Sequence, residues 1–188
     1  MYNKLKVIGL LTGRDSIRLI TKVLGGVDNV YISSTGFNSR ILYEESKDTC
    51  NFYITGAMGC ASSFALGFSR HSSRRIVVID GDGSLTMRLS NMILLGKDRN
   101  VNVLHVLLNN GVHESTGGQK ALGIGIDFKK VAKTCKYSKT YRVKNYFSLE
   151  KRLRYLKKKK GTIFLQVDTV ENIEKPTARI SVHATKAR

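Results

Sequence analysis

Residues 76–84 read Ile-Val-Val-Ile-Asp-Gly-Asp-Gly-Ser, and residues 103–110 read Val-Leu-His-Val-Leu-Leu-Asn-Asn. Each stretch is an apolar, β-branched-rich run of strand length that ends abruptly on small and oxygen-bearing residues. Asp82 and Asn110 are 28 positions apart, which leaves room for one crossover helix between two parallel strands. The two side chains are therefore predicted to lie side by side at the carboxyl edge of a sheet, where open α/β folds bind ligands.

The chemistry of this pair favours a magnesium ion and a diphosphate. Mg²⁺ prefers carboxylate, carbonyl and phosphate oxygens in octahedral geometry, and Asp82 and Asn110 offer two such hard ligands. Gly81 and Gly83 allow the backbone to turn tightly and to approach phosphate oxygens closely. The two stretches together predict a metal–diphosphate site at the sheet edge.

Three blocks in chain order resemble a known family. They are Gly-Ala-Met-Gly-Cys-Ala-Ser at 56–62, Gly-Asp-Gly at 81–83, and Asn-Asn-Gly-Val-His-Glu-Ser-Thr-Gly-Gly-Gln at 109–119. Gly-Asp-Gly, 25 further residues and then Asn-Asn resemble the thiamine-diphosphate-binding motif. All three blocks together resemble the thiamine-diphosphate-dependent decarboxylases of phosphonopyruvate and sulfopyruvate. The likeness runs from about residue 12 to residue 167, and it covers only the diphosphate-binding (C-terminal) half of such an enzyme.

The resemblance implies contacts for thiamine diphosphate and Mg²⁺. Asp82, Asn110 and the main-chain carbonyl of Val112 are implied as metal ligands. Met58 is implied as the wedge that holds the cofactor in a bent conformation, whereas read alone it is a core methionine beside a tight turn. The implied cofactor-binding residues are Thr35, Gly36, Gly56, Ala57, Met58, Gly81, Asp82, Gly83, Ser84, Asn110 and Val112.

Some of these positions have simpler alternatives. Thr35 and Gly36 form a turn before a predicted helix, so they are either an anion contact or a plain helix cap. His113 and Glu114 are the candidate catalytic residues, because they follow the metal-binding Asn110 and project toward the substrate in the resembled enzymes. As an unplaced loop residue, His113 has a surface histidine as its alternative interpretation. Cys60 stands where relatives usually carry histidine.

One component of the resembled enzymes is missing. They need a glutamate from a pyrimidine-binding domain to activate the cofactor, and no such half is recognisable in this chain. We therefore expect the β-type subunit of a split decarboxylase, which acts on a 2-oxo acid with an anionic head together with a separate pyrimidine-binding subunit. The alternative is a catalytically inactive half-domain that serves a structural role.

The order of elements predicts an α/β fold, a doubly wound, mostly parallel sheet with helices on both faces. The whole chain, 1–188, is expected to be one domain with a flexible tail at 171–188. Residues 110–125 show neither a strand nor a helix period, which is typical of a functional loop. Strands are predicted at 30–33, 52–55, 76–80, 103–110, 138–143 and 162–167, and helices at 14–24, from 39 onward, and at 60–69, 85–95, 127–134 and 148–157.

The formal net charge of +18 has two interpretations. It either attracts anionic ligands or nucleic acid, or it is the solvated face of a lysine-rich protein. The one dense run, residues 157–160, lies at a predicted helix end, where cations suit the helix dipole. The sequence has no RNA-binding motif and no basic recognition helix with interleaved aromatic residues, so a nucleic-acid partner is not expected.

The remaining bulk features predict a cytoplasmic protein with free thiols. The three cysteines are widely spaced and form no C-x-x-C pair, so neither a disulfide framework nor a zinc site is indicated. Residues 1–11 lack the apolar run of a signal peptide, and no apolar stretch is long enough to cross a membrane.

Overall fold

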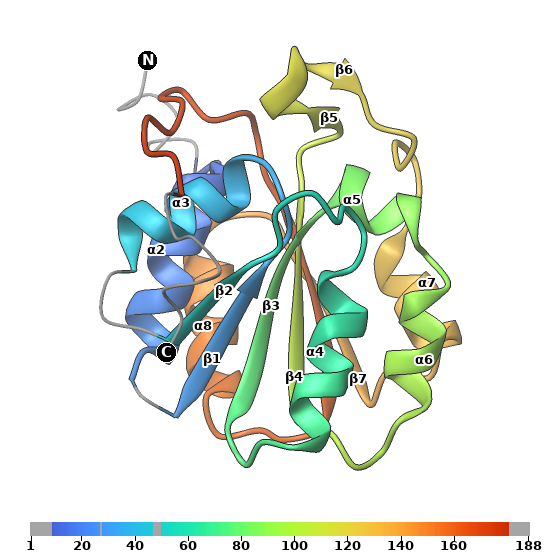
Figure 1. The fold of residues 1–188 in the computed structure, drawn as a ribbon. Coiled ribbons are helices and arrows are strands. Elements are labelled where there is room, and N and C mark those ends of the chain that lie inside the picture. Colours follow the sequence, from blue (N-terminus) through green and yellow to red (C-terminus); the bar gives the residue numbers. More distant parts are fainter. Residues whose placement is uncertain (1–8, 27, 47–49, 181–188) are drawn as a thin grey trace.

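The computed structural model describes residues 9–26, 28–46 and 50–180. Six strands form one sheet in the order β2-β1-β3-β4-β8-β7, and every neighbouring pair is parallel (Figure 1). The predicted doubly wound α/β fold is confirmed. The strands are β1 (Asn29–Ser33), β2 (Cys50–Tyr53), β3 (Arg75–Gly81), β4 (Val103–Asn109), β7 (Lys139–Val143) and β8 (Thr162–Asp168).

The two central strands are the stretches that decided the fold. Nearly every residue of β3 and β4 is buried, which explains why both read as continuous apolar runs. They pair in register from Ile76 opposite Val103 to Gly81 opposite Leu108. The two strands therefore end at the same level of the sheet.

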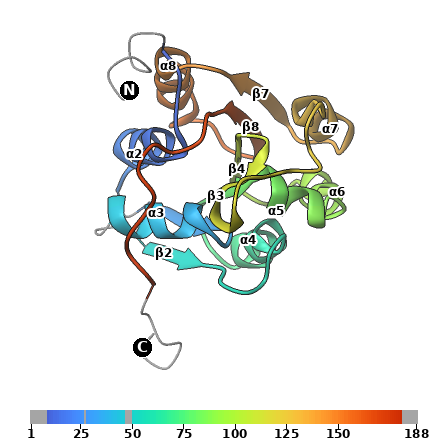
Figure 2. The same ribbon diagram turned by 90° about the horizontal axis from the view of Figure 1, so that it is seen from above.

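Helices cover both faces of the sheet (Figure 2). One face packs against α2 (Gly13–Leu24), α3 (Phe37–Glu45) and α8 (Tyr146–Leu156). The other packs against α4 (Ala61–Arg70), α5 (Asp82–Met87), α6 (Asn91–Lys97) and α7 (Phe128–Thr134). Alternate residues of each strand serve the two apolar cores, as the period of a β-strand requires.

The direction of winding reverses between β1 and β3. After β1 the chain passes through α3 on one face to the edge strand β2, and β3 then lies on the other side of β1. The helix after β3, α5, covers the opposite face. A crevice between the carboxyl ends of β1 and β3 is the topological switch point at which such folds bind ligands.

The single helix predicted at 85–95 is wrong. The structure has α5 ending at Met87 and α6 beginning at Asn91. Arg88 is non-helical, with φ −139° and ψ 54°. Asn91 uses its side-chain amide to donate to the carbonyl of Gly59 at 3.0 Å. This tertiary contact fixes the second helix against the turn before α4.

The predicted loop at 110–125 also contains structure that its sequence period did not reveal. Strands β5 (Val112–His113) and β6 (Gln119–Lys120) form a small antiparallel hairpin, with the short 3-10 helix η1 (Glu114–Thr116) at its tip. The strands are too short to show a period in the sequence. We call residues 111–121 the site hairpin.

Cys50, Cys60 and Cys135 are free thiols. Among the described residues, no helix is long and apolar enough to cross a bilayer.

Gly96 tests the packing of α6. It lies inside this helix, and a methyl group at its position would overlap the main-chain carbonyl oxygen of Cys135. We expect Gly96→Ala to lower the free energy of unfolding by about 1–3 kcal/mol, measured by chemical denaturation.

Gly67 is the matched control, because it lies inside α4 with no atom within 4 Å of an added methyl group. Gly67→Ala is expected to raise stability by about 0.4–1 kcal/mol. Equal effects of the two substitutions would contradict the packing that the structure shows.

Candidate functional site

A pocket opens at the carboxyl ends of β1, β3 and β4, at the switch point. It brings together the residues predicted from the Gly-Asp-Gly and Asn-Asn stretches with the turn after β1. Its lining includes ten of the predicted residues: Thr35, Met58, Gly81, Asp82, Gly83, Ser84, Asn110, Val112, His113 and Glu114.

Three predicted residues lie outside this lining. Gly36 is the N-cap of α3 with φ +88°, and a methyl group there would stand 3.0 Å from the Ser115 hydroxyl of the site hairpin. Gly56 and Ala57 are exposed in the turn that leads to Met58. Position 56 favours glycine, because its φ of +78° lies in the left-handed region. The structure places all three beside the pocket and leaves their binding role a prediction.

Asp82 is the most buried acid of the pocket, with 2% of its surface exposed. Its Oδ1 accepts the Gly83 N–H at 2.9 Å, and its Oδ2 accepts the Gly111 N–H at 2.8 Å. Burial raises the pKa of this carboxyl, although the two backbone donors lower it. Among the described residues no lysine or arginine forms an ion pair with Asp82. A bound cation would supply the missing positive charge.

Asn110 directly precedes Gly111, and two hydrogen bonds orient its side-chain amide. The Oδ1 atom accepts the Val112 N–H at 3.1 Å, and Nδ2 donates to Glu114 Oε2 at 3.0 Å. No cluster of three or more His, Cys, Asp or Glu side chains suited to a metal occurs in the described part of the chain. A cation in the pocket would therefore be held by one carboxylate with amide and backbone oxygens, which is a donor set for a hard ion such as Mg²⁺.

Two serines from different loops line this site, Ser34 and Ser84. Ser34 is buried, and its hydroxyl has no hydrogen-bond partner in the part of the chain that the structure describes. Ser84, at the start of α5, accepts the Gly59 N–H at 3.1 Å. The unpaired Ser34 hydroxyl fits an oxyanion ligand, because a buried donor without a partner is costly. Ser34 was missed because it was read only as part of the turn that contains Thr35 and Gly36.

His113 packs directly on the Gly-Asp-Gly loop. Any side chain at Gly83 would collide with the His113 ring, although the backbone of Gly83 has no positive φ. Gly83 is therefore required for close approach, and the site hairpin is seated on the loop that carries Asp82.

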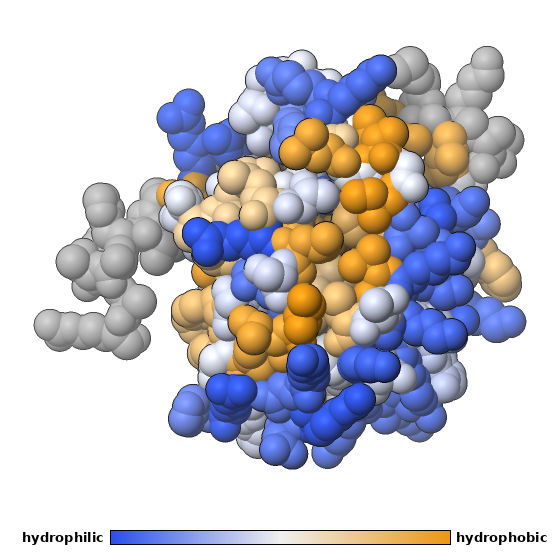
Figure 3. All heavy atoms as spheres, turned by 90° about the vertical axis from the view of Figure 1, so that its right-hand side faces the viewer, coloured by the Kyte–Doolittle hydropathy of each residue, from blue (hydrophilic) through white to orange (hydrophobic). Residues whose placement is uncertain are grey.

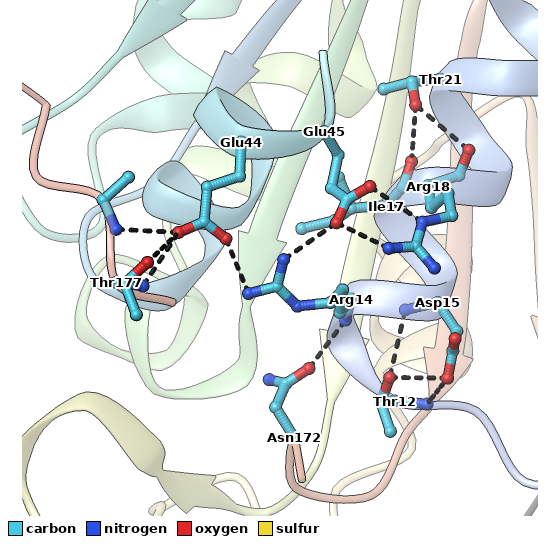
Figure 4. Close-up of polar contacts among 11 residues, drawn as sticks. Thr12, Arg14, Asp15, Ile17, Arg18, Thr21, Glu44, Glu45, Asn172 and Thr177 are labelled. Carbon is cyan, nitrogen blue, oxygen red and sulfur yellow. Dashed lines mark hydrogen bonds and ion pairs between the residues drawn. The ribbon is translucent and has the colours of Figure 1, made fainter. Parts of the chain in front are cut away.

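Glu114 is held from a distant part of the sequence. Its Oε1 accepts the Asn172 N–H at 2.6 Å, and its Oε2 accepts the Asn172 side-chain amide at 3.0 Å. Asn172 in turn accepts the Arg14 N–H at 2.8 Å (Figure 4). Burial raises the pKa of Glu114, although these hydrogen bonds lower it. No local motif marks Asn172, so its part in the pocket was not predicted.

Hydrogen bonds hold the chain after β8 against the ion-paired residues of α2 and α3 (Figure 4). Arg14 pairs with Glu44 at 2.7 Å and with Glu45 at 2.9 Å. Glu44 accepts the N–H groups of Thr177 and Ala178 at 2.9 and 2.8 Å. Residues 171–180 of the predicted flexible tail thus make specific contacts, while 181–188 lie outside the described residues.

The charge of the lining is unusual for a protein of net charge +18. No lysine or arginine is among the described residues that line the pocket, and its acids are Asp82 and Glu114. A diphosphate in this pocket would be bound by neutral donors and a metal ion.

Met58 and Cys60 complete the turn before α4. Met58 is half-buried and lines the pocket. Cys60 is the N-cap of α4, and its side chain makes no capping hydrogen bond. The Cys60 thiol therefore does not cap α4.

Comparisons with known proteins agree with this geometry. The family model "Thiamine pyrophosphate enzyme, C-terminal TPP binding domain" matches residues 34–167. The chain is 44% identical to a phosphonopyruvate decarboxylase of Streptomyces viridochromogenes over 110 residues, which cover 58% of this chain and 28% of that protein. It is 38% identical to a sulfopyruvate decarboxylase subunit beta of Methanothermobacter thermautotrophicus, with 64% of each chain covered. The matches thus span less than two thirds of these relatives.

Solved structures show the same fold at low sequence identity. A benzoylformate decarboxylase from Polynucleobacter necessarius superimposes with a TM-score of 0.73 at 14% identity, over 86% of this chain and 34% of that one. A thiamin diphosphate-dependent enzyme from Mycobacterium smegmatis gives a TM-score of 0.72 at 19% identity, over 86% and 32%. These likenesses concern the fold alone.

Gly83→Ala tests the seating of His113. We expect the ring to rotate out of the pocket, while the free energy of unfolding changes by no more than about 1.5 kcal/mol, because the ring is half-exposed and can change rotamer. Imidazole NMR shifts or a crystal structure measure the displacement. Gly81→Ala is the control, since its nearest contact is the Asn38 amide at 3.3 Å and its φ is −106°. An unmoved His113 ring would contradict the proposed contact.

The variant Glu114→Gln tests whether the pKa of the Glu114 carboxyl is raised, through the pH dependence of folding stability. Because the pKa of Glu114 is raised in the folded chain, the native state binds its proton more tightly than the unfolded state does. Stability relative to the variant should therefore fall as pH rises from the ordinary pKa of 4.5 through the raised value, and stay level above it. Denaturation curves from about pH 4 to about pH 8 measure this difference. A relative gain of wild-type stability with rising pH would show that Glu114 is held as a carboxylate instead.

Proposed function

The chain belongs to the family of thiamine pyrophosphate enzymes, through their C-terminal TPP-binding domain, and we propose that it is the diphosphate-binding subunit of a split decarboxylase. The proposed substrate is a 2-oxo acid with an anionic head, phosphonopyruvate or sulfopyruvate, and the product is the aldehyde. The similarity to both kinds of decarboxylase supports this substrate class.

One observation carries the proposal. The Asp82 carboxylate and the Asn110 amide follow different strands and line the same pocket. They accept successive backbone N–H groups of one turn, Asp82 that of Gly111 and Asn110 that of Val112. Ser34 lines the same pocket, and its buried hydroxyl has no hydrogen-bond partner among the described residues. This combination of hard oxygen ligands and neutral donors fits a Mg²⁺ diphosphate better than it fits a core or a plain turn.

The residues present fit the cofactor and its metal. Asp82, Asn110 and the Val112 carbonyl would hold Mg²⁺, and bound thiamine diphosphate would supply the electron sink for decarboxylation. Ser34, Ser84 and the backbone of the Gly-Asp-Gly loop would bind the diphosphate oxygens. Met58 would support the cofactor ring from below.

His113 and Glu114 are proposed to act on the substrate side of the pocket. Glu114 has a raised pKa because of burial, so it can retain a proton for transfer at higher pH than an exposed glutamate. Asn172 and Asn110 fix the orientation of its carboxyl group. His113, seated over Gly83, would present a ring nitrogen to the substrate.

A partner subunit is supported by an apolar surface beside the pocket. Figure 3 shows apolar side chains gathered on the face that carries α5, α6 and the loop before α7. Ile124 of this surface lies against Gly111 of the site hairpin, so the surface reaches the rim of the pocket. Exposed patches of this kind mark interaction sites. The exposed side chains include Met87 at 62%, Leu94 at 56%, Leu122 at 86% and Ile124 at 56%.

The partner would also supply what the pocket lacks. The anionic head of the substrate needs cationic donors, yet no lysine or arginine among the described residues lines the pocket. The activating glutamate is likewise expected from the pyrimidine-binding subunit. The beta-subunit relatives support such a two-subunit assembly.

Asp82→Asn is the direct test. Thiamine diphosphate is titrated against the purified chain with and without Mg²⁺, and with and without a pyrimidine-binding subunit. We expect Mg²⁺-dependent binding that falls by at least about 100-fold in the variant, because losing a ligand exceeds the tenfold to 100-fold cost of losing an outer-shell partner.

Asp127→Asn is the matched control. Asp127 caps α7 by accepting the Lys130 N–H, and asparagine caps equally well. Its cofactor affinity should equal that of the wild type. Cofactor affinity that is independent of Asp82 would refute the proposed metal site. Cofactor binding without decarboxylation by the assembled subunits would favour the inactive half-domain.

A further inference from the structure

We propose that the chain has a second anion-binding site, at the amino edge of the sheet, that takes a small molecule with several phosphate groups. A cavity of about 700 Å³ lies among the turns that enter the strands. These turns are at the end of the sheet opposite to the carboxyl ends of the strands (Figure 1). We call it the basic pocket. It is lined by Lys22, Leu24, Gly25, Gly26, Asp28, Asn29, Ser73, Arg74, Arg75, Asn102 and residues 157–160.

The basic pocket gathers an excess of positive charge. Seven of its lining residues are lysine or arginine, against one acid, Asp28. None of the seven forms an ion pair with another described residue. The helices α2 and α8 end here, but each contributes only about half of a negative elementary charge. The cations therefore exceed what the helix dipoles can balance, and a polyanion would relieve their repulsion.

Arg75 gives the basic pocket a rigid wall, which a cluster of surface lysines alone would not have. It is only 7% exposed, and its guanidinium donates to the carbonyls of Leu156, at 2.8 Å, and of Lys159. These bonds hold the turn that carries Lys157–Lys160. The Nε atom of Arg75 is buried and has no hydrogen-bond partner among the described residues. Arg75 lines the cavity and has no ion pair with another described residue, so its buried guanidinium adds an unbalanced positive charge to the wall.

The facing wall is fixed in the same way. Asn29, 8% exposed, donates its amide to the carbonyls of Leu24 and Gly25 at 3.2 and 2.6 Å. This holds the end of α2, and with it Lys22, at the mouth of the pocket. Both walls are therefore preorganised by buried polar side chains from β1 and β3 before a ligand binds.

The shape and lining favour a small phosphate ester over a nucleic acid. The volume lies within the range of roughly 300–1,000 Å³ that is typical of small-molecule sites. No aromatic residue of the described ranges lines the pocket, so bases would find no stacking platform among them. Lysine ammonium groups bind phosphates as compact point charges. Asn102 and Ser73 add neutral polar groups.

The test uses inorganic triphosphate as the probe, measured by calorimetry on the full chain in EDTA so that no metal site competes. The variant Lys157→Gln/Lys158→Gln/Lys160→Gln removes three exposed cations of the pocket. The control removes three exposed lysines elsewhere and has the same net charge: Lys129→Gln/Lys133→Gln/Lys144→Gln.

We expect wild type and control to bind one triphosphate per chain with equal affinity, and the pocket variant to bind at least tenfold more weakly, at an unchanged melting temperature. Asp82→Asn should bind triphosphate as the wild type does, which separates this site from the first pocket. Equal weakening in both lysine variants would overturn the proposal in favour of diffuse charge. Tighter binding of a single-stranded oligonucleotide, lost in the same pocket variant, would overturn it in favour of a nucleic-acid surface.

Discussion

The structure depends on the parallel register between β3 and β4. These two strands are buried on both faces, so apolar packing decides how they align, and a slip by one residue would turn every side chain to the opposite face. With Gly81 opposite Leu108, the chain leaves both strands at the same level. That alignment alone brings the Asp82 carboxylate within 2.8 Å of the Gly111 N–H. The polar site is thus positioned by an apolar constraint.

Buried polar groups support the same loop from behind. Asp80 Oδ1 accepts the Gly81 N–H at 2.9 Å, while its Oδ2 lies 3.5 Å from His105 Nε2. His105 Nδ1 lies 2.9 Å from the Tyr137 hydroxyl, next to the start of β7. All three side chains are buried, and neither Asp80 Oδ2 nor His105 Nε2 has a hydrogen-bond partner among the described residues. Buried polar side chains thus extend from the end of β3 across β4 to Tyr137, just before the start of β7.

The sequence predicted those features of the structure that depend on local residue patterns. The buried strands, the doubly wound fold and the meeting of Asp82 with Asn110 follow from apolar runs and their spacing. Asn172 and Arg75 were not predictable in this way, because their roles arise from long-range contacts. Asn172 contacts Glu114, which is 58 positions away in the sequence, and Arg75 contacts Leu156, which is 81 positions away. The helix break after Met87 likewise depends on the contact of Asn91 with Gly59. His105 was read as one more residue of an apolar run.

An all-parallel sheet has two chemically different edges, and this chain has a pocket at each. Helices run opposite to the strands, so their amino ends face the carboxyl edge and their carboxyl ends face the amino edge. At the carboxyl edge the pocket has neutral donors and buried acids, so an anion there would need helix amino ends and a metal to balance its charge. At the amino edge the helix dipoles disfavour anions, and only an excess of lysine and arginine reverses the sign. The lysines at 157–160 thus lie at the edge where the helix ends give an anion no favourable interaction. An anion that binds there needs these side-chain charges.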